Sequence, residues 1–291
     1  MADLPGGVYT ALVTPLTERE DVDYAVLRTL VDWQRQHGVK GVVVCGTTGE
    51  GTSLSVPERE RIIAAVREYA NDLKVIAGTG CANLPETISL SRFAQQQGCD
   101  AILVIPPFYY KGVSEEGLIA YYMRLLDAVE TPTLLYNYPG LAGVDITPAV
   151  IEGLLDYPHV IGLKDSSGCW ETVLSFLLRF PRLQIFVGAE NLLVDALASG
   201  AAGCISGLAN ALPELIVGID AASRRREEVT QLGERLEAVM NAVDAVPFIP
   251  AIKQICVWRG LPRMAVRPPL RELTAQQADM LRRALQSLEV L

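Results

Sequence analysis

The sequence has few of the residues that bind metals or build disulfide frameworks. Its 291 residues include two histidines, neither in a metal-ligand pattern, and six cysteines without a Cys-x-x-Cys pair. Cysteines in apolar runs such as "GVVVCG" and "AAGCISG" are typical of small, reduced core side chains. We therefore expect neither a disulfide scaffold nor a metal site.

Long apolar runs are also missing. No segment offers about twenty uninterrupted apolar residues, so we expect no membrane span and no membrane partner. The N-terminal "MADLPGGVYTALVTPL" lacks the basic start and the apolar stretch of a signal peptide. A cytoplasmic protein is the expectation.

Positive charge is scarce as well. The net charge is -9, and the one dense basic run, 224–226, is followed at once by Glu227 and Glu228. That pattern is typical of a solvated helix face rather than of a surface that follows a phosphate backbone. We expect a small-molecule substrate and no nucleic acid.

Half of the residues are hydrophobic, and many of them form short runs rich in branched side chains. Such runs, bounded by Gly, Pro, Asn or Asp, are typical of parallel strands covered on both faces. They are "VYTALV", "GVVVCG", "KVIAGTG", "AILVIPP", "TPTLLYNYP", "VIGLKD", "LQIFVGAE" and "GCISGL".

Helix-length amphipathic segments separate these eight runs. In "DVDYAVLRTLVDWQRQHG", Val26, Leu30 and Trp33 share one face and Gly38 ends the helix, while Ser55 is a cap for the next helix. Eight strand–helix units predict a closed (β/α)8 TIM barrel. We assign the barrel to residues 1–220 and a C-terminal helical extension to 221–291.

An open doubly wound sheet is the alternative architecture. It would carry a glycine-rich dinucleotide turn after the first strand, and "LVTPLTERED" contains none. The sequence therefore favours the barrel and indicates no nucleotide cofactor.

In a barrel the active site lies at the carboxyl ends of the strands. The second strand is followed there by "GTTGE", whose Gly46, Thr47 and Thr48 can converge on a carboxylate or a phosphate. The same residues also fit an ordinary glycine-rich turn.

The fifth and sixth strands end in Tyr136 and Lys164. A tyrosine there can shuttle a proton or remain a half-buried aromatic. A lysine among apolar neighbours can attack a carbonyl as its neutral amine, or extend its ammonium group to solvent.

The last two strands end in "VGAENLL" and "CISGLAN". Gly188 permits close approach of a ligand, and Glu190, Asn191 and Ser206 can bind hydroxyl groups. These loops carry no basic residue, which favours a neutral, hydroxylated substrate portion over a phosphate.

Three motifs in this order, "GTTGE", "YNYPG" and "GLKDSSG", resemble those of the N-acetylneuraminate lyase and dihydrodipicolinate synthase superfamily. These are pyruvate-dependent class I aldolases, and the likeness extends from "GVYTALVTPL" to the late "VRPPL". The resemblance implies a homotetramer, a dimer of dimers, and no cofactor beyond a covalent imine on a lysine.

The resemblance also implies roles for single residues. Lys164 would form the Schiff base, Thr47 and Thr48 would hold the pyruvate carboxylate, and Tyr136 would be the general acid and base. The "PPFYYKG" segment resembles the one that presents a tyrosine to a neighbouring subunit, with Tyr110 the nearer match and Tyr109 the alternative.

One departure from the synthase pattern bears on the substrate. The synthases have an arginine for the second carboxylate where this chain has Leu141, and without it that carboxylate loses a bidentate partner. We therefore expect an aldolase that cleaves a 2-keto-3-deoxy sugar acid or a related hydroxy-2-oxo acid. The alternatives are dihydrodipicolinate synthase (4-hydroxy-tetrahydrodipicolinate synthase) activity, sugar-acid dehydration through the same imine, and a non-enzymatic 2-oxo acid binding module.

Overall fold

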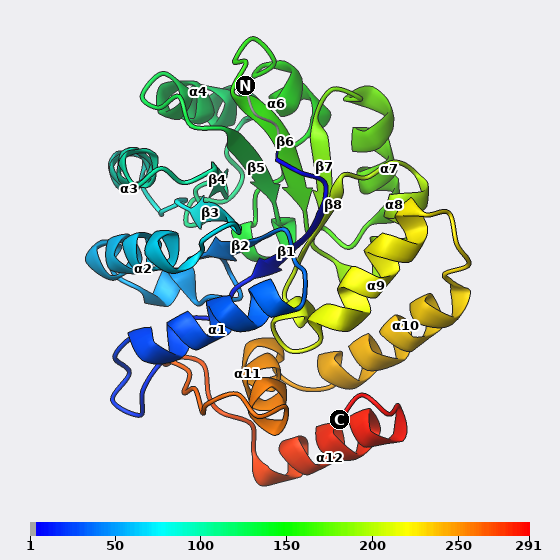
Figure 1. Cartoon of the computed structure of the whole chain (residues 1–291). Coiled ribbons are helices and arrows are strands. Elements are labelled where there is room, and N and C mark those ends of the chain that lie inside the picture. Colours follow the sequence, from blue (N-terminus) through cyan, green and yellow to red (C-terminus); the bar gives the residue numbers. More distant parts are fainter. Residues whose placement is uncertain (1–3) are drawn as a thin grey trace.

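The computed structural model describes residues 4–291. It is a closed barrel of eight parallel strands in sequence order, as the sequence predicts (Figure 1). The strands are β1 (Gly7–Ala11), β2 (Gly41–Val44), β3 (Lys74–Gly78), β4 (Ala101–Val104), β5 (Thr133–Asn137), β6 (Val160–Asp165), β7 (Gln184–Val187) and β8 (Gly203–Ser206). The first three residues of the N-terminal segment, for which no signal peptide was expected, lie outside the described residues.

Helices surround the barrel and connect the strands (Figure 1). They are α1 (Tyr24–Gln36), α2 (Val56–Tyr69), α3 (Leu84–Gln96), α4 (Glu115–Leu126), α5 (Pro139–Ala142), α6 (Pro148–Glu152), α7 (Trp170–Arg179), α8 (Leu193–Ala198) and α9 (Pro213–Arg224). Short 3-10 turns lie at Gly51–Ser53, Glu190–Leu192 and Leu208–Asn210. Ser55 caps α2 as predicted, because its hydroxyl accepts the Glu58 N–H while the Glu58 carboxylate accepts the Ser55 N–H.

The strands bury side chains on both faces, which explains their uninterrupted apolar runs. One set fills the barrel interior and includes Tyr9, Ile76, Leu103 and Phe186. The other packs between the strands and the helices. The barrel closes between β8 and β1, where a Cβ on Gly203 would lie 1.9 Å from the Gly7 carbonyl oxygen. Only glycine permits that approach.

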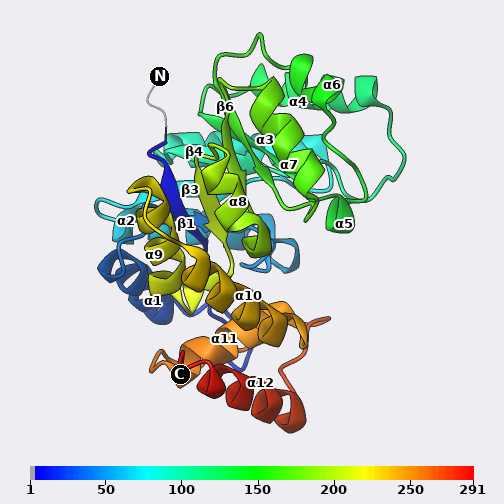
Figure 2. The same ribbon diagram turned by 90° about the vertical axis from the view of Figure 1, so that its right-hand side faces the viewer.

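Three further helices form the C-terminal helical extension: α10 (Thr230–Asp244), α11 (Phe248–Trp258) and α12 (Ala275–Ser287). They pack together beside one end of the barrel (Figure 2). The sequence predicts helix throughout 214–244, but helix is interrupted at 225–229, where Arg226 has a φ of 56°. The predicted domain boundary at residue 220 falls within α9, which packs on β1 and α8.

The cysteines are largely core residues, as expected. Within the described chain all six are free thiols, and five are buried. Cys169, just before α7, is the exposed exception. No helix among residues 4–291 is long and apolar enough to cross a bilayer.

The "VRPPL" segment attaches the helical extension to the second βα unit. Arg267 donates to the Ser53 carbonyl oxygen at 2.6 Å and to both carboxylate oxygens of Glu58, at 2.8 and 3.3 Å. The hydrogen bond from Arg267 is the largest cause that lowers the pKa of Glu58 from 4.5 to about 2. The ionised carboxylate is therefore favoured in the folded state.

We expect Glu58→Gln to lower the free energy of unfolding at pH 7 by about 1.5 kcal/mol, the usual size for a charge-assisted hydrogen bond. Because the folded pKa of Glu58 lies below the unfolded one, its contribution is complete above about pH 4.5 and is lost as the pH falls toward 2. Urea unfolding of both proteins at pH 7, 5 and 3 measures this. Glu60→Gln, on the same helix, is the matched control, and a pH-independent difference would contradict the prediction.

Candidate active site

Lys164 and Tyr136 lie side by side near the carboxyl ends of neighbouring strands. β5 and β6 pair so that Tyr136 is opposite Lys164, and both residues are buried. The amine of Lys164 donates to the Tyr136 hydroxyl at 3.4 Å and lies 4.4 Å from the centre of its ring. The register of the two strands thus places the predicted amine next to the predicted proton carrier.

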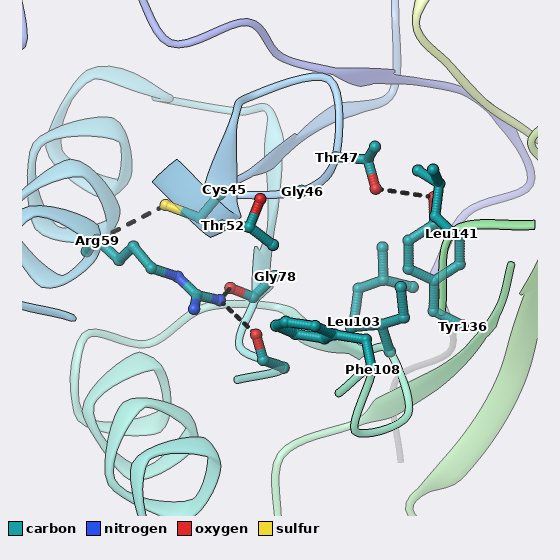
Figure 3. A pocket seen from close by; sticks show the side chains of 13 residues that line it. Cys45, Gly46, Thr47, Thr52, Arg59, Gly78, Leu103, Phe108, Tyr136 and Leu141 are labelled. Atoms are coloured by element: carbon teal, nitrogen blue, oxygen red, sulfur yellow. Dashed lines mark hydrogen bonds between the residues drawn. The ribbon is translucent and has the colours of Figure 1, made fainter. Parts of the chain in front are cut away.

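The "GTTGE" turn brings a third predicted group to the same place. Thr47 Oγ1 and Tyr136 Oη are 3.3 Å apart, within hydrogen-bond distance (Figure 3). The backbone is left-handed at both Cys45, with φ 57°, and Glu50, with φ 55°. Such conformations are unfavourable for residues with a side chain, so the surrounding structure must hold this turn in place.

A cavity of about 270 Å³ contains Lys164, Tyr136, Thr47 and Thr48 in its wall. Strand β8 also contributes Ile205, the strand-end loops contribute Tyr138, Ser166, Gly188, Ala189, Glu190, Asn191 and Gly207, and the helical extension contributes Met240, Asp244, Phe248 and Ile249. The sequence predicted the contribution of the loops and missed that of the extension. No sequence pattern in 240–249 marks it, because the approach of α10 and α11 to the barrel is a tertiary contact.

The chain has five lysines, at 40, 74, 111, 164 and 253, of which Lys164 and Lys253 are buried. Burial of an ammonium group is costly unless a counter-ion or hydrogen bonds compensate it. Lys253 is compensated by Glu50, at 2.5 Å. Lys164 has no carboxylate within ion-pair distance anywhere in residues 4–291, and its amine lies at the cavity. This position fits a chemical role better than a structural one.

Glu190 and Ser206 are joined by hydrogen bonds within the protein. Ser206 is fully buried and donates to Glu190 Oε1 at 2.8 Å, and the N–H groups of Gly207 and Leu208 donate to the same oxygen at 2.8 and 3.0 Å. Ser206 Oγ also accepts the Ala209 N–H. Glu190 lines the cavity as expected. Ser206 does not line it and instead holds the Glu190 carboxylate by a hydrogen bond.

Asn137 and Asp165 form a brace that the sequence reasoning missed. Asn137 Nδ2 donates to Asp165 Oδ2 at 2.7 Å, and Asn137 Oδ1 accepts the Ile146 N–H. Asp165 Oδ1 accepts the N–H and hydroxyl of Ser167. The signal was available, because each residue directly follows a site residue, Tyr136 or Lys164. The brace fixes both strand ends.

Gly188 leaves the space that the Lys164 side chain occupies. A Cβ at position 188 would lie 2.5 Å from Lys164 Cε and 2.1 Å from Ser166 Oγ. We expect Gly188→Ala to lower kcat/KM at least about hundredfold, since a displacement near 1 Å at a reacting group costs that much. Steady-state kinetics checks this. Gly218→Ala, where nothing lies within 4 Å of the new Cβ, is the matched control, and full activity of Gly188→Ala would refute the assignment.

A second cavity, of about 300 Å³, adjoins the first and shares Thr47 and Tyr136 with it. Gly46 and Leu141 line this second cavity (Figure 3). Its one cation is Arg59, whose guanidinium donates to the carbonyl oxygens at Gly78 and Gly80. Leu141 is 54% exposed and brings no charge to this second cavity.

Tyr109 and Tyr110 lie outside both cavities, on the loop between β4 and α4. They are 76% and 71% exposed, and their rings meet edge to face with centres 5.4 Å apart. Within one chain neither reaches Lys164. Among the described residues, no three His, Cys, Asp or Glu side chains converge as metal ligands.

Comparison with known proteins agrees with this geometry. A model of the Dihydrodipicolinate synthetase family matches residues 4–288. An uncharacterized DapA-like lyase of Chloroflexus aurantiacus is 41% identical over 98% of this chain and 97% of its own length. The structure of a chloride-inhibited dihydrodipicolinate synthase from Acinetobacter baumannii, complexed with pyruvate, has a TM-score of 0.94 at 30% identity, covering 99% of this chain and 100% of that one.

A second solved structure is YagE, a prophage protein of E. coli K12, also in complex with pyruvate. It has a TM-score of 0.93 at 30% identity, covering 98% of this chain and 99% of that one. The fold and these matches define the class: a carbon–carbon lyase of the class I aldolase type. More particularly, the chain belongs to the dihydrodipicolinate synthetase family. The resemblance predicted from three sequence motifs is confirmed.

Proposed function

We propose that the protein catalyses a reversible aldol reaction of pyruvate with an aldehyde through an imine on Lys164. The observation that carries the proposal is the buried Lys164 amine, which has no carboxylate partner among residues 4–291 and lies 3.4 Å from the Tyr136 hydroxyl at a cavity. Relatives whose structures contain pyruvate support the choice of the keto acid.

In the cleavage direction, the neutral amine attacks C2 of the 2-oxo acid, and Tyr136 protonates the departing hydroxyl, so that loss of water leaves the protonated imine and the Tyr136 phenolate. Tyr136 accepts the proton of the C4 hydroxyl as the C3–C4 bond breaks, and the bonding electrons move into the protonated imine to form an enamine. The aldehyde leaves. Tyr136 then gives that proton to C3, and water hydrolyses the protonated imine to pyruvate and free Lys164, returning a proton to Tyr136.

Thr47 and Thr48 are well placed to donate to the pyruvate carboxylate, because both line the cavity that contains Lys164. We also propose a homotetramer, a dimer of dimers, in which Tyr110 of one subunit completes the proton path at Thr47 of its neighbour. The exposure of both Tyr109 and Tyr110 supports this arrangement, since large aromatic side chains gather at interfaces.

We assign the substrate to the 2-keto-3-deoxy sugar acids or related hydroxy-2-oxo acids. The synthase reaction with aspartate semialdehyde is the main competitor, because relatives at 32–39% identity are 4-hydroxy-tetrahydrodipicolinate synthases. Leu141 argues against it, because a hydrocarbon side chain gives a second carboxylate no partner. A dehydratase working through the same imine would release water and no pyruvate, so a pyruvate assay separates the two reactions.

Borohydride reduction in the presence of pyruvate tests the imine directly. We expect a stable mass increase on a single tryptic peptide, with the modification at Lys164. The other four lysines serve as internal controls in the same digest. Lys253 is the most stringent control, because it is buried like Lys164. Labelling at any other lysine, or none at all, would overturn the proposed function.

A further inference from the structure

The helical extension places one carboxylate at the cavity. Asp244, the last residue of α10, lines the same cavity as Lys164. It forms no ion pair and no side-chain hydrogen bond with any residue of 4–291. Partial burial raises the pKa of its carboxyl group above 3.8. Asp244 is solvent-exposed and lines the cavity, so its carboxylate is free to accept hydrogen bonds from a molecule bound there.

Two more polar side chains in this wall have no internal partner. Tyr138 and Asn191 line the cavity, and neither side chain makes a hydrogen bond within the described chain. Burial is the main cause that raises the pKa of Tyr138, and the charges of Tyr136, Glu190 and Asp244 add to it. Tyr138 therefore keeps its proton and can donate. One donor, one carboxylate acceptor and one amide together match the hydrogen-bonding pattern of hydroxyl groups.

The charges around the cavity have an uneven distribution. Lys164 is the one cation among the residues that line it, and Glu190 and Asp244 are two carboxylates. In the proposed function, the imine engages Lys164, and Thr47 and Thr48 bind the pyruvate carboxylate. With those groups engaged, the charged side chains left in this wall are Asp244 and Glu190, and no cation in it remains to pair with a second carboxylate. A carboxylate in that position would be repelled, whereas hydroxyl groups would be bound.

We propose that Asp244, together with Tyr138 and Asn191, selects an aldehyde that carries hydroxyl groups and rejects one that carries a carboxylate. This inference rests on the proposed function and assigns the choice of aldehyde to the helical extension. Asp244 is a specificity-determining residue, and the C–C bond chemistry remains with Lys164 and Tyr136.

The test compares two aldehydes in condensation with pyruvate: glyceraldehyde, which is neutral and hydroxylated, and succinic semialdehyde, which carries a carboxylate. The wild-type protein should prefer glyceraldehyde at least about hundredfold in kcat/KM. Asp244→Asn keeps the shape and removes the charge. It should lower kcat/KM for glyceraldehyde about tenfold and raise it for succinic semialdehyde about tenfold, while the KM for pyruvate stays unchanged.

Asp279→Asn is the matched control, because Asp279 is an exposed carboxylate on α12 that pairs with Arg283. It should leave the preference between aldehydes as in the wild type. Borohydride trapping with pyruvate, in the wild type and in Asp244→Asn, distinguishes failure of the role of Asp244 from failure of the proposed function. A trapped Lys164 adduct with an unchanged aldehyde preference would overturn the role of Asp244 alone. No adduct in the wild type would overturn the proposed function, and a wild-type preference for succinic semialdehyde would overturn the inference.

Discussion

Lys164→Arg should have no measurable turnover, with kcat/KM lowered at least about ten-thousandfold. At 1.36 kcal/mol per factor of ten, that is about 5.4 kcal/mol of transition-state stabilisation. Arginine keeps the positive charge and most of the length, but its guanidinium does not lose a proton in proteins and cannot form the imine. The loss would therefore report chemistry rather than charge or packing.

The measurement pairs steady-state pyruvate release with borohydride trapping. The variant should give no labelled peptide, and far-UV circular dichroism should show an unchanged fold. Lys40→Arg, at an exposed position outside the cavity, should behave as the wild type. Turnover by Lys164→Arg above one hundredth of the wild-type rate would show that another group carries the reaction.

Lys253→Met should lower the free energy of unfolding by about 3–5 kcal/mol, the cost of removing one partner from a buried ion pair. Lys253 and Glu50 are 2% exposed or less. Lys253 donates to Glu50 Oε1 at 2.5 Å and to the Ala265 carbonyl oxygen at 2.6 Å. Methionine has a similar volume, so the loss comes mainly from the unpaired, buried carboxylate of Glu50.

This pair links α11 to the end of the "GTTGE" turn that contains Thr47. We therefore expect Lys253→Met to weaken pyruvate binding as well as the fold, seen as a higher KM at a temperature where the variant is folded. Urea unfolding gives the stability change. Lys74→Met is the matched control, since Lys74 pairs with Asp100 at the surface and should cost under about 1 kcal/mol.

A double variant makes the test sharper. Glu50→Gln with Lys253→Met removes the uncompensated charge. The amide oxygen that replaces the carboxylate can still accept the backbone N–H of Arg267, which Glu50 Oε2 accepts at 2.9 Å. The double variant should be more stable than Lys253→Met alone. If Lys253→Met alone unfolds within about 1 kcal/mol of the wild type, the ion pair does not hold this turn.

Local sequence features predicted most of the fold, because each depends on neighbours in the chain. The strand runs are buried on both faces, as at 160–165, and the cap at Ser55 is a bond to a residue three positions away. The break at 225–229 was missed. The residue types at 225–229 do not exclude a helix. The break follows from the path that the chain takes between α9 and α10.

The candidate site divides in the same way. Lys164, Tyr136 and Thr47 could be predicted to meet, because the carboxyl ends of parallel strands lie at one end of a barrel. The sequence also indicated Ser206 for substrate hydroxyls, but its hydroxyl bonds to Glu190 in the protein interior. Predicting that contact requires the side-chain rotamers of Ser206 and Glu190 and the distance between their two segments, and local sequence patterns specify neither.

The sequence by itself determined the barrel, the family and the lysine that we assign to the imine. All three follow from short-range patterns: apolar runs, helix caps and motifs at strand ends. Only the tertiary structure decided that Lys164 has no counter-ion within residues 4–291 while Lys253 has one, and that α10 brings Asp244 to the same cavity. Counter-ions and cavity walls come from segments distant in sequence, and their positions follow from the packing of the helical extension on the barrel.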